Sequence, residues 1–271
     1  MTTTEADSAC ANAVGTGGVE MAGERALFVY GIVPSDVEPT GDAVGVGDPP
    51  GEVTVIRQGR LAALVSEIPL ETPLGRPADL RAYQELLDGT AAVAPVLPVR
   101  FGTALNGPDG VTDLLATHQD RFAAALAELE GRVQYTLHGR YREREFVAAV
   151  LAHDPAAADL AAQVRGQPEE ATRQQRIRLG ELISQAVELS REEETRQLLD
   201  ALGPLAVVSA PRAASSEMDA GYAVFLVDTE RAEEFIAAAE EYAEQRRELI
   251  RARLLGPLAP YDFANADQLV R

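Results

Sequence analysis

The residues in this sequence with the greatest capacity for chemistry are three histidines, two glutamate clusters and one cysteine. They are His118, His138 and His153, then Glu192, Glu193 and Glu194, then Glu240, Glu241 and Glu244, and Cys10. Histidine and cysteine act as metal ligands or nucleophiles, and neighbouring carboxylates act as acid and base or bind cations. Because each of these chemistries needs short, fixed spacings, the spacing decides which of them is possible.

The histidines and the cysteine do not have the spacing of a metal site. No histidine pair forms H-x-x-x-H or H-E-x-x-H, and each histidine falls in a different expected element. His118 lies one helical turn from Leu114 and Phe122, which favours a half-buried helix residue with a hydrogen bond. Cys10 stands alone, which excludes a disulfide framework and a cysteine metal cluster. We therefore expect neither a metal nor a cofactor.

The glutamate clusters and the glycine-rich loop do not indicate catalysis either. Both clusters fall within expected helices without apolar neighbours to raise a carboxyl pKa, as is typical of a solvated helix face. The sequence has no lysine, which excludes a phosphate-binding P-loop. The glycines of residues 41–51 lack the G-x-G-x-x-G order that leads into a helix. Serine occurs without a G-x-S-x-G elbow, so we expect a protein that is not an enzyme.

Composition sets the class of protein and its partners. A length of 271 residues allows two domains, and 46% hydrophobic with 25% charged residues is typical of a folded globular protein. The formal net charge is -19, which repels nucleic acid and anionic membrane surfaces. Residues 1–23 are small and polar, with no secretory signal pattern and no apolar periodicity. We expect a disordered leader there and a cytoplasmic protein.

The first expected domain covers residues 24–131 and mixes strands with helices. Residues 26–33 form an apolar run of strand length, and residues 53–57 and 61–65 flank Gly59 as a hairpin would. Residues 77–94 follow a helical period with Leu80, Tyr83, Leu86 and Leu87 on one face. Residues 96–102 read as an edge strand because of a proline. Residues 113–130 read as one helix that ends at Gly131.

The second expected domain covers residues 132–255 and resembles a ferredoxin-like unit. Apolar and polar residues alternate over 133–138 as in a half-buried strand. Helices are expected at 144–152, 154–164, 169–202 and 229–249, and strands at 205–209, 221–227 and 250–255. With the helical insert set aside, the order is β-α-β-β-α-β. The predicted fold class is therefore α+β with two domains, the second a modified ferredoxin-like domain. Residues 256–271 are expected to form a C-terminal tail that packs across the domain junction.

Three stretches of the chain resemble the gas vesicle protein F/L family. They are L-F-V-Y-G-I-V at 27–33, V-L-P-V-R-F-G-T at 96–103 and G-P-L-A-P-Y-D-F at 256–263. The last is similar to the terminal G-P-W-P-P-Y-x-F signature of the family, with Leu258 and Ala259 in place of its Trp and Pro. The three matches occur in the family's order and span nearly the whole chain after the leader.

The resemblance implies an accessory or minor structural protein of gas vesicle formation. It implies the major shell protein and other vesicle accessory proteins as partners, and a location in the cytoplasm associated with the gas vesicle. Unassembled shell subunits must expose apolar surface, so an acidic partner that covers it would prevent aggregation during nucleation and assembly. A ferredoxin-like second domain is also what the resemblance implies.

The candidate partner-binding residues come from the second and third of these stretches. They are Arg100, Phe101, Pro257, Pro260, Tyr261 and Phe263, because aromatic and arginine side chains are favoured binding anchors. The alternative is that they pack the domain junction. Two other functions also remain open: an adaptor in a different protein complex, and a small-ligand-binding ferredoxin-like protein, which would require a pocket with converging polar groups.

Overall fold

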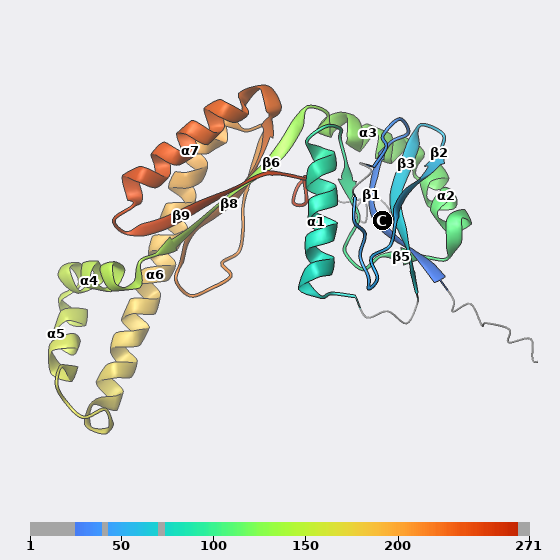
Figure 1. Ribbon diagram of the computed structural model, residues 1–271. Helices are drawn as coiled ribbons and strands as arrows, with labels where there is room; N and C mark the ends of the chain where they lie inside the picture. Colours follow the sequence, from blue (N-terminus) through green and yellow to red (C-terminus); the bar gives the residue numbers. More distant parts are fainter. Residues whose placement is uncertain (1–24, 40–42, 70–73, 265–271) are drawn as a thin grey trace, which may run out of the picture.

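The computed structural model describes residues 25–39, 43–69 and 74–264 of the chain. The leader predicted over residues 1–23, with Cys10, lies outside these residues, as does the end of the predicted tail. The described chain forms two antiparallel sheets, each with its own helices (Figure 1). We call residues 25–129 the first lobe and residues 132–258 the second lobe. The division into two domains near Gly131 stays a prediction.

The first lobe is built on a sheet with the strand order β2-β3-β1-β4, and β5 also pairs with β1. Its strands are β1 (Arg25–Pro34), β2 (Val53–Gln58), β3 (Leu61–Pro69), β4 (Leu97–Pro98) and β5 (Ala104–Leu105). The predicted hairpin is present as β2 and β3, and Gly59 between them has a φ of 61°, a left-handed angle that suits glycine. The strand predicted around Pro98 shrinks to two residues at the sheet edge.

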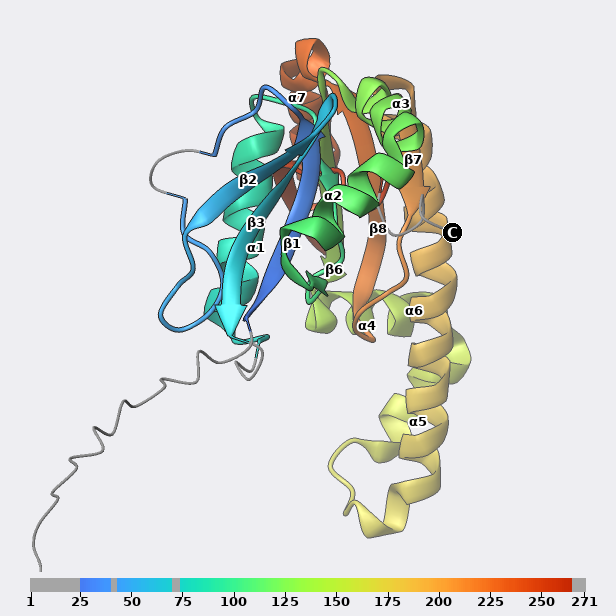
Figure 2. The same cartoon turned by 90° about the vertical axis from the view of Figure 1, so that its right-hand side faces the viewer.

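Helices cover both faces of this first sheet. Helix α1 (Pro77–Ala91) packs on one face, and α2 (Gly107–Thr117) with α3 (Gln119–Leu129) pack on the other (Figure 2). Leu80 was predicted on the buried face of α1, but it is exposed, because the core contacts are made by Tyr83, Leu86 and Leu87. The single helix predicted over 113–130 is wrong, since the backbone of His118, with φ -112° and ψ 16°, separates α2 from α3.

The second lobe is a four-stranded sheet with the order β7-β8-β6-β9. Its strands are β6 (Arg132–Tyr141), β7 (Val208–Pro211), β8 (Asp219–Asp228) and β9 (Ile250–Leu258). The first and third strands of this lobe, β6 and β8, form the central pair, and the second and fourth, β7 and β9, flank it, which is the split arrangement expected of a β-α-β-β-α-β unit. Strand β7 begins three residues later than predicted.

Helices α6 (Arg173–Leu202) and α7 (Ala232–Arg246) pack on one face of this sheet. Helices α4 (Glu143–His153) and α5 (Pro155–Val164) form the predicted insert, and α5 projects away from both sheets with the first part of α6 (Figure 1). Asp154 caps α5, since its Oδ1 accepts a hydrogen bond from the amide of Ala156 at 2.8 Å. Short 3-10 turns occupy Glu170–Thr172, Gly203–Leu205 and Thr229–Arg231.

Candidate functional site

The three stretches that carry the family resemblance meet around one tyrosine of α1. The ring of Tyr83 stacks near Tyr30 of β1, with 6.2 Å between the ring centroids. It also makes an edge-on contact with Phe101 at 5.4 Å and lies 6.3 Å from Tyr261 of the C-terminal segment. Side chains that are distant in sequence thus form one aromatic cluster, which fixes the C-terminal segment against α1.

A tight turn positions Phe101 in this cluster. The carbonyl oxygen of Arg100 accepts hydrogen bonds from the amide of Thr103 at 3.1 Å and from its hydroxyl at 2.8 Å. Gly102 has a φ of 90°, which a residue with a side chain rarely adopts. The turn directs Phe101 into the lobe and leaves the side chain of Arg100 exposed. The hydroxyl of Tyr83 then donates to the carbonyl of Val99 at 2.6 Å, which ties α1 to the same stretch.

A carboxylate of α1 holds the C-terminal segment. Oδ1 of Asp88 accepts hydrogen bonds from the amide of Ala259 at 2.8 Å and from the hydroxyl of Tyr261 at 3.0 Å. Burial raises the pKa of Asp88, and these two hydrogen bonds partly oppose that rise. Burial and the nearby Asp88 charge also raise the pKa of Tyr261. The raised pKa keeps the hydroxyl of Tyr261 protonated at neutral pH, so Tyr261 is the donor of this hydrogen bond.

The same segment also joins the second lobe. Gln134 of β6 donates from Nε2 to Oδ2 of Asp262 at 2.7 Å, and its Oε1 accepts from the amide of Asp262 at 3.0 Å. The other carboxylate oxygen of Asp262 pairs with Nε of Arg212 at 3.3 Å. Phe263 and Leu226 of β8 both pack against the core on the α2 and α3 face of the first lobe. Residues 259–263 therefore contact both lobes. The tail predicted over residues 256–271 begins inside β9 in the structure, and its packing across a domain junction stays a prediction.

The structure places the six predicted site residues in two groups. Pro260 is buried, and Phe101, Tyr261 and Phe263 are half-buried in packing between elements, whereas Arg100 and Pro257 are exposed. Their role in binding a partner stays a prediction.

Sequence reasoning did not find Asp88, Gln134 or Asp262, which make the polar contacts of the junction. Gln134 was expected on a solvated strand face, but it is 1% exposed because the first lobe and residue 262 cover that face. Asp88 adjoins the apolar stripe of α1, and no local pattern marks a partner 171 residues away.

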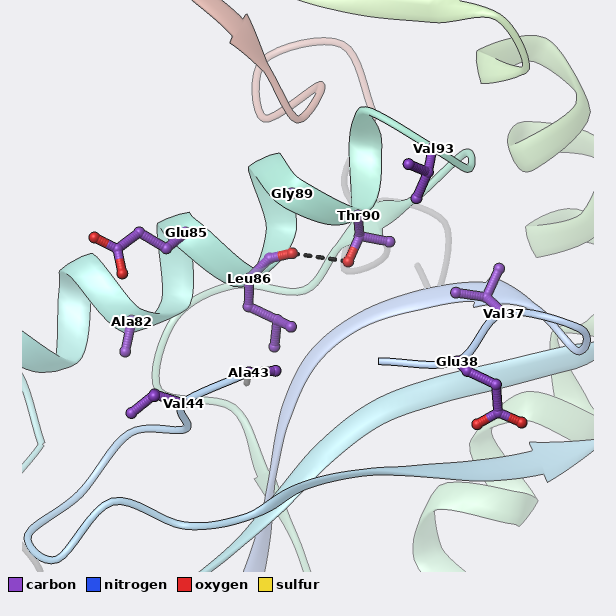
Figure 3. A pocket seen from close by; sticks show the side chains of 10 residues that line it. All are labelled: Val37, Glu38, Ala43, Val44, Ala82, Glu85, Leu86, Gly89, Thr90 and Val93. Carbon is purple, nitrogen blue, oxygen red and sulfur yellow. Dashed lines mark hydrogen bonds between the residues drawn. The ribbon is translucent and has the colours of Figure 1, made fainter. Parts of the chain in front are cut away.

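An apolar groove lies on the first lobe, between α1 and the loop that follows β1 (Figure 3). It has a volume of about 240 Å³. Its lining residues are Val37, Glu38, Ala43, Val44, Ala82, Glu85, Leu86, Gly89, Thr90 and Val93. Val44 and Val93 are 55% and 83% exposed, so the groove presents apolar side chains to solvent at its rim. Helix α1 is therefore shared by the groove and by the junction.

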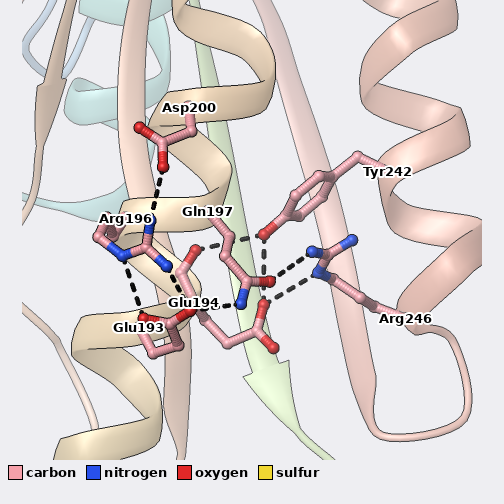
Figure 4. A network of polar contacts seen from close by, with 7 residues as sticks. All are labelled: Glu193, Glu194, Arg196, Gln197, Asp200, Tyr242 and Arg246. Atoms are coloured by element: carbon pink, nitrogen blue, oxygen red, sulfur yellow. Dashed lines mark hydrogen bonds and ion pairs between the residues drawn. The ribbon is translucent and has the colours of Figure 1, made fainter.

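A polar network fastens α6 to α7 in the second lobe (Figure 4). Oε2 of Glu194 pairs with Nε of Arg246 at 3.0 Å, and Nη2 of Arg246 donates to Oε1 of Gln197 at 2.7 Å. The guanidinium also stacks 3.7 Å above the centroid of the Tyr242 ring. The prediction that this glutamate lies on a solvated helix face is wrong for Glu194, because packing of α7 leaves the pair only about one-fifth exposed. Arg246 of α7 thus contacts both Glu194 and Gln197 of α6, which joins the two helices.

The described residues form neither a metal-binding cluster nor a membrane-spanning helix. In the part of the chain that the structure describes, no group of three or more His, Cys, Asp or Glu is placed to hold a metal ion. None of the helices within the described ranges has the length and apolar character needed to cross a membrane. The polar groups found at the junction and between α6 and α7 are engaged with each other rather than converging on an open pocket.

Comparison with known proteins assigns the family. Residues 26–265 match the family of gas vesicle synthesis proteins GvpL/GvpF. The chain belongs to this family. It is 32% identical over 240 residues to gas vesicle protein F of Streptomyces sp. (strain CB03234), which covers 87% of this chain and 98% of that protein. It is also 30% identical over 267 residues to gas vesicle protein L of the same strain, which covers 90% of this chain and 94% of that protein.

Two crystal structures of GvpF proteins have the same fold as this member of the GvpL/GvpF family. The GvpF of Anabaena sp. PCC7120 has a TM-score of 0.71 at 23% identity, covering 89% of this chain and 98% of that one. The GvpF of Microcystis aeruginosa has a TM-score of 0.68 at 23% identity, covering 89% and 99%. The α+β fold with two sheets is therefore the fold of the family.

Proposed function

We propose that this chain is a non-catalytic accessory protein of gas vesicle formation that binds the major shell protein in the cytoplasm. In this proposal it covers apolar surface of unassembled shell subunits and prevents their aggregation until they add to a growing vesicle. Membership of the GvpL/GvpF family supports a role in gas vesicles. The observation that carries the binding step is the exposed apolar rim of the groove beside α1.

The groove combines two properties that such a role needs. Val44 and Val93 present apolar surface that a strongly apolar partner would bury, and burial of each valine contributes roughly 1.5 kcal/mol to binding. Glu38 and Glu85 stand beside them, so the site remains hydrated when no partner is bound. A formal charge of -19 on the whole chain would keep a complex with an apolar subunit dispersed.

The junction gives this groove a fixed shape. Tyr83 and Asp88 anchor one side of α1 to the C-terminal segment, while Ala82 and Leu86 of the same helix line the groove. A rigid site loses less conformational entropy on binding than a mobile one. In this proposal Phe101 and Tyr261 act on the partner indirectly, by holding the helix that contacts it, whereas Phe263 packs on the opposite face of the sheet, with α2 and α3.

The test is co-expression with the major shell protein, measuring how much shell protein stays soluble and how much co-purifies. We expect the wild-type chain to increase both amounts. The Val44→Asp/Val93→Asp variant should lower co-purification about tenfold or more, since it places charges on the buried contact. The matched control is Ile177→Asp/Leu189→Asp, which changes two exposed apolar residues of α6 away from the groove. Absence of any association with the wild-type chain, when both proteins are well expressed, would overturn the proposal.

A further inference from the structure

Three arginines share one face of the second sheet. Arg140 of β6 lies directly opposite Arg251 of β9, and Arg253 of β9 lies opposite His138 of β6. Cross-strand partners point to the same side of a sheet, so the three arginines project together. All three are exposed. We call these three residues the arginine face.

The arginine face is on the side of the sheet opposite α6 and α7. The alternate residues of the same strands, Leu137 and Leu254, pack into the core formed with those two helices. Further along β6, Gln134 is on the same side as the arginines, but there the first lobe covers the sheet. Figure 1 shows the antiparallel pair of β6 and β9 extending between the first lobe and α4. Arg140 is near the end of β6 that leads into α4, and Arg251 is opposite it, so the arginine face lies at the end away from the first lobe.

The charge of this face is not neutralised from within the described chain. Arg140, Arg251 and Arg253 form no ion pair and no side-chain hydrogen bond with any described residue, whereas several other arginines, such as Arg25, Arg132 and Arg246, pair with carboxylates. Like charges directly opposite each other on one sheet face destabilise a sheet. The carboxylate of Asp219 lies opposite Arg140 on β8, but it forms no ion pair with any of the three arginines, so the face keeps three unpaired guanidinium groups in a chain of net charge -19.

The neighbouring acidic group is already engaged. Asp219 lies with Oδ1 3.0 Å from Nε2 of His138 and accepts hydrogen bonds from the hydroxyls of Ser215 and Ser216 at 2.8 and 2.7 Å. Tyr222 stacks beside His138, with ring centroids 4.5 Å apart. Three further carboxylates, Glu143, Glu188 and Glu217, line a pocket with Arg140 at the α4 end, but none of them forms an ion pair with the arginine face.

Protection of the sheet edge explains only part of this arrangement. Strand β9 is at an edge of the sheet, and charged side chains on an edge strand discourage pairing with other chains. That reason applies to Arg251 and Arg253. It does not apply to Arg140, because β6 is paired on both sides, with β8 and with β9. Arg140 instead lies between Asp219 of β8 and Arg251 of β9, so edge protection is not its role.

We propose that the arginine face is a docking site for an acidic segment of a partner protein. Guanidinium groups bind carboxylates through paired, directional hydrogen bonds. An exposed row of arginines is therefore better suited to bind carboxylates than a row of lysines would be. Charge complementarity selects this occupant, since bound carboxylates would remove the Arg140–Arg251 repulsion. Nucleic acid fits less well, because its affinity depends on neutralising many phosphates and the rest of the chain repels it. The site is separate from the groove of the first lobe.

The experiment measures binding of a fluorescent decaglutamate peptide by anisotropy at low ionic strength. The test variant is Arg140→Gln/Arg251→Gln/Arg253→Gln. The control, Arg144→Gln/Arg165→Gln/Arg173→Gln, removes the same charge from exposed arginines that also form no ion pair with a described residue. We expect the wild type and the control to bind alike and the test variant to bind about tenfold more weakly. The thermal midpoint of the test variant should be no lower than that of the control, because the repulsion is relieved.

Three outcomes would overturn the proposal. The first is no binding of decaglutamate by the wild type. The second is an equal loss in the test and control variants, which would assign the effect to net charge. The third is tighter binding of a decathymidylate oligonucleotide than of decaglutamate, with the same dependence on the three arginines, which would assign the face to phosphates. None of these measurements depends on the shell protein, so the result stands apart from the co-expression test.

Discussion

The carboxylate of Asp88 accepts a hydrogen bond from the hydroxyl of Tyr261 at 3.0 Å, although 173 residues separate the two in sequence. The same oxygen accepts a hydrogen bond from the amide of Ala259. One atom of α1 thus holds two points of the C-terminal segment, and the segment in turn holds Gln134 of the second lobe. The predictions below test this junction and the contacts that support it.

Removing the acceptor should destabilise the protein more than removing one donor. We expect Asp88→Ala to lower the free energy of unfolding by about 1–3 kcal/mol and Tyr261→Phe by about 0.5–1.5 kcal/mol. The double variant should lose less than the sum, because both changes remove the same hydrogen bond. Urea unfolding of the four proteins measures this coupling. Glu85→Ala, at an exposed position of the same helix, is the control. Strict additivity would contradict the contact.

Stability should fall in acid through a buried aspartate at the start of α1. The Arg76 guanidinium holds the pKa of Asp79 well below its usual range, and the amide of Gly47 adds a hydrogen bond. A carboxyl with a lowered folded-state pKa stabilises the fold above its unfolded-state pKa of about 3.9, and this contribution is lost as the pH falls below that value. Asp79→Asn should therefore cost about 2 kcal/mol at neutral pH and progressively less below about pH 4.

The measurement is urea unfolding of the wild type and Asp79→Asn over a series of pH values. Asp113→Asn changes an exposed aspartate of α2 and should leave the free energy of unfolding within about 0.5 kcal/mol of the wild type. A cost of Asp79→Asn that is the same at pH 7 and at about pH 3 would contradict the assigned charge state.

Two glycines should respond oppositely to alanine. Gly256 has a φ of 146°, and an added Cβ would lie 2.4 Å from Cδ1 of Tyr135. Gly256→Ala should thus lower the free energy of unfolding by more than about 2 kcal/mol. Gly180 is within α6 and a Cβ there meets no atom within 4 Å. Gly180→Ala should raise stability by about 0.5–1 kcal/mol, as alanine is the better helix former. Thermal unfolding distinguishes the two signs.

The α6–α7 network should depend on Glu194 and not on its neighbour. Glu194→Gln leaves Arg246 about one-fifth exposed without its carboxylate, which should cost about 1–3 kcal/mol of unfolding free energy. Glu192→Gln, two residues earlier at an exposed position, should cost less than about 0.5 kcal/mol. Equal effects of the two substitutions in chemical denaturation would show that the network does not fasten the helices.

The elements that sequence reasoning predicted correctly depend on local chemistry. The β2–β3 hairpin follows from two short β-rich runs around Gly59, and the start of α5 follows from Asp154 before a proline. The β-α-β-β-α-β order needs only the succession of periodicities along the chain. Each of these features is determined by residues within a few positions of one another, so one sequence is sufficient to find it.

The errors occur where distant residues decide the outcome. Apolar residues keep a helical period on both sides of His118, and no glycine or proline marks the break there. Gln134 occupies a polar position in the alternating pattern of residues 133–138, which predicts a solvated side chain. In the structure Asp262 covers this side chain. Within the candidate site, the family resemblance pointed to Tyr261 and Phe263 as candidate residues. Nothing in the sequence pointed to Asp88, because the partners of Asp88 are at the other end of the chain.

The route of the C-terminal segment also sets an order of events during synthesis. Residues 259–263 leave the ribosome after everything they contact, and their contacts include Asp88, Tyr83 and Gln134. Domains generally begin to fold from the N-terminus while the chain is still being made. The carboxylate of Asp88 therefore has no Ala259 or Tyr261 donor until the whole second lobe has been translated. Helix α1 thus gains its last tertiary contacts only after residue 263 has been translated.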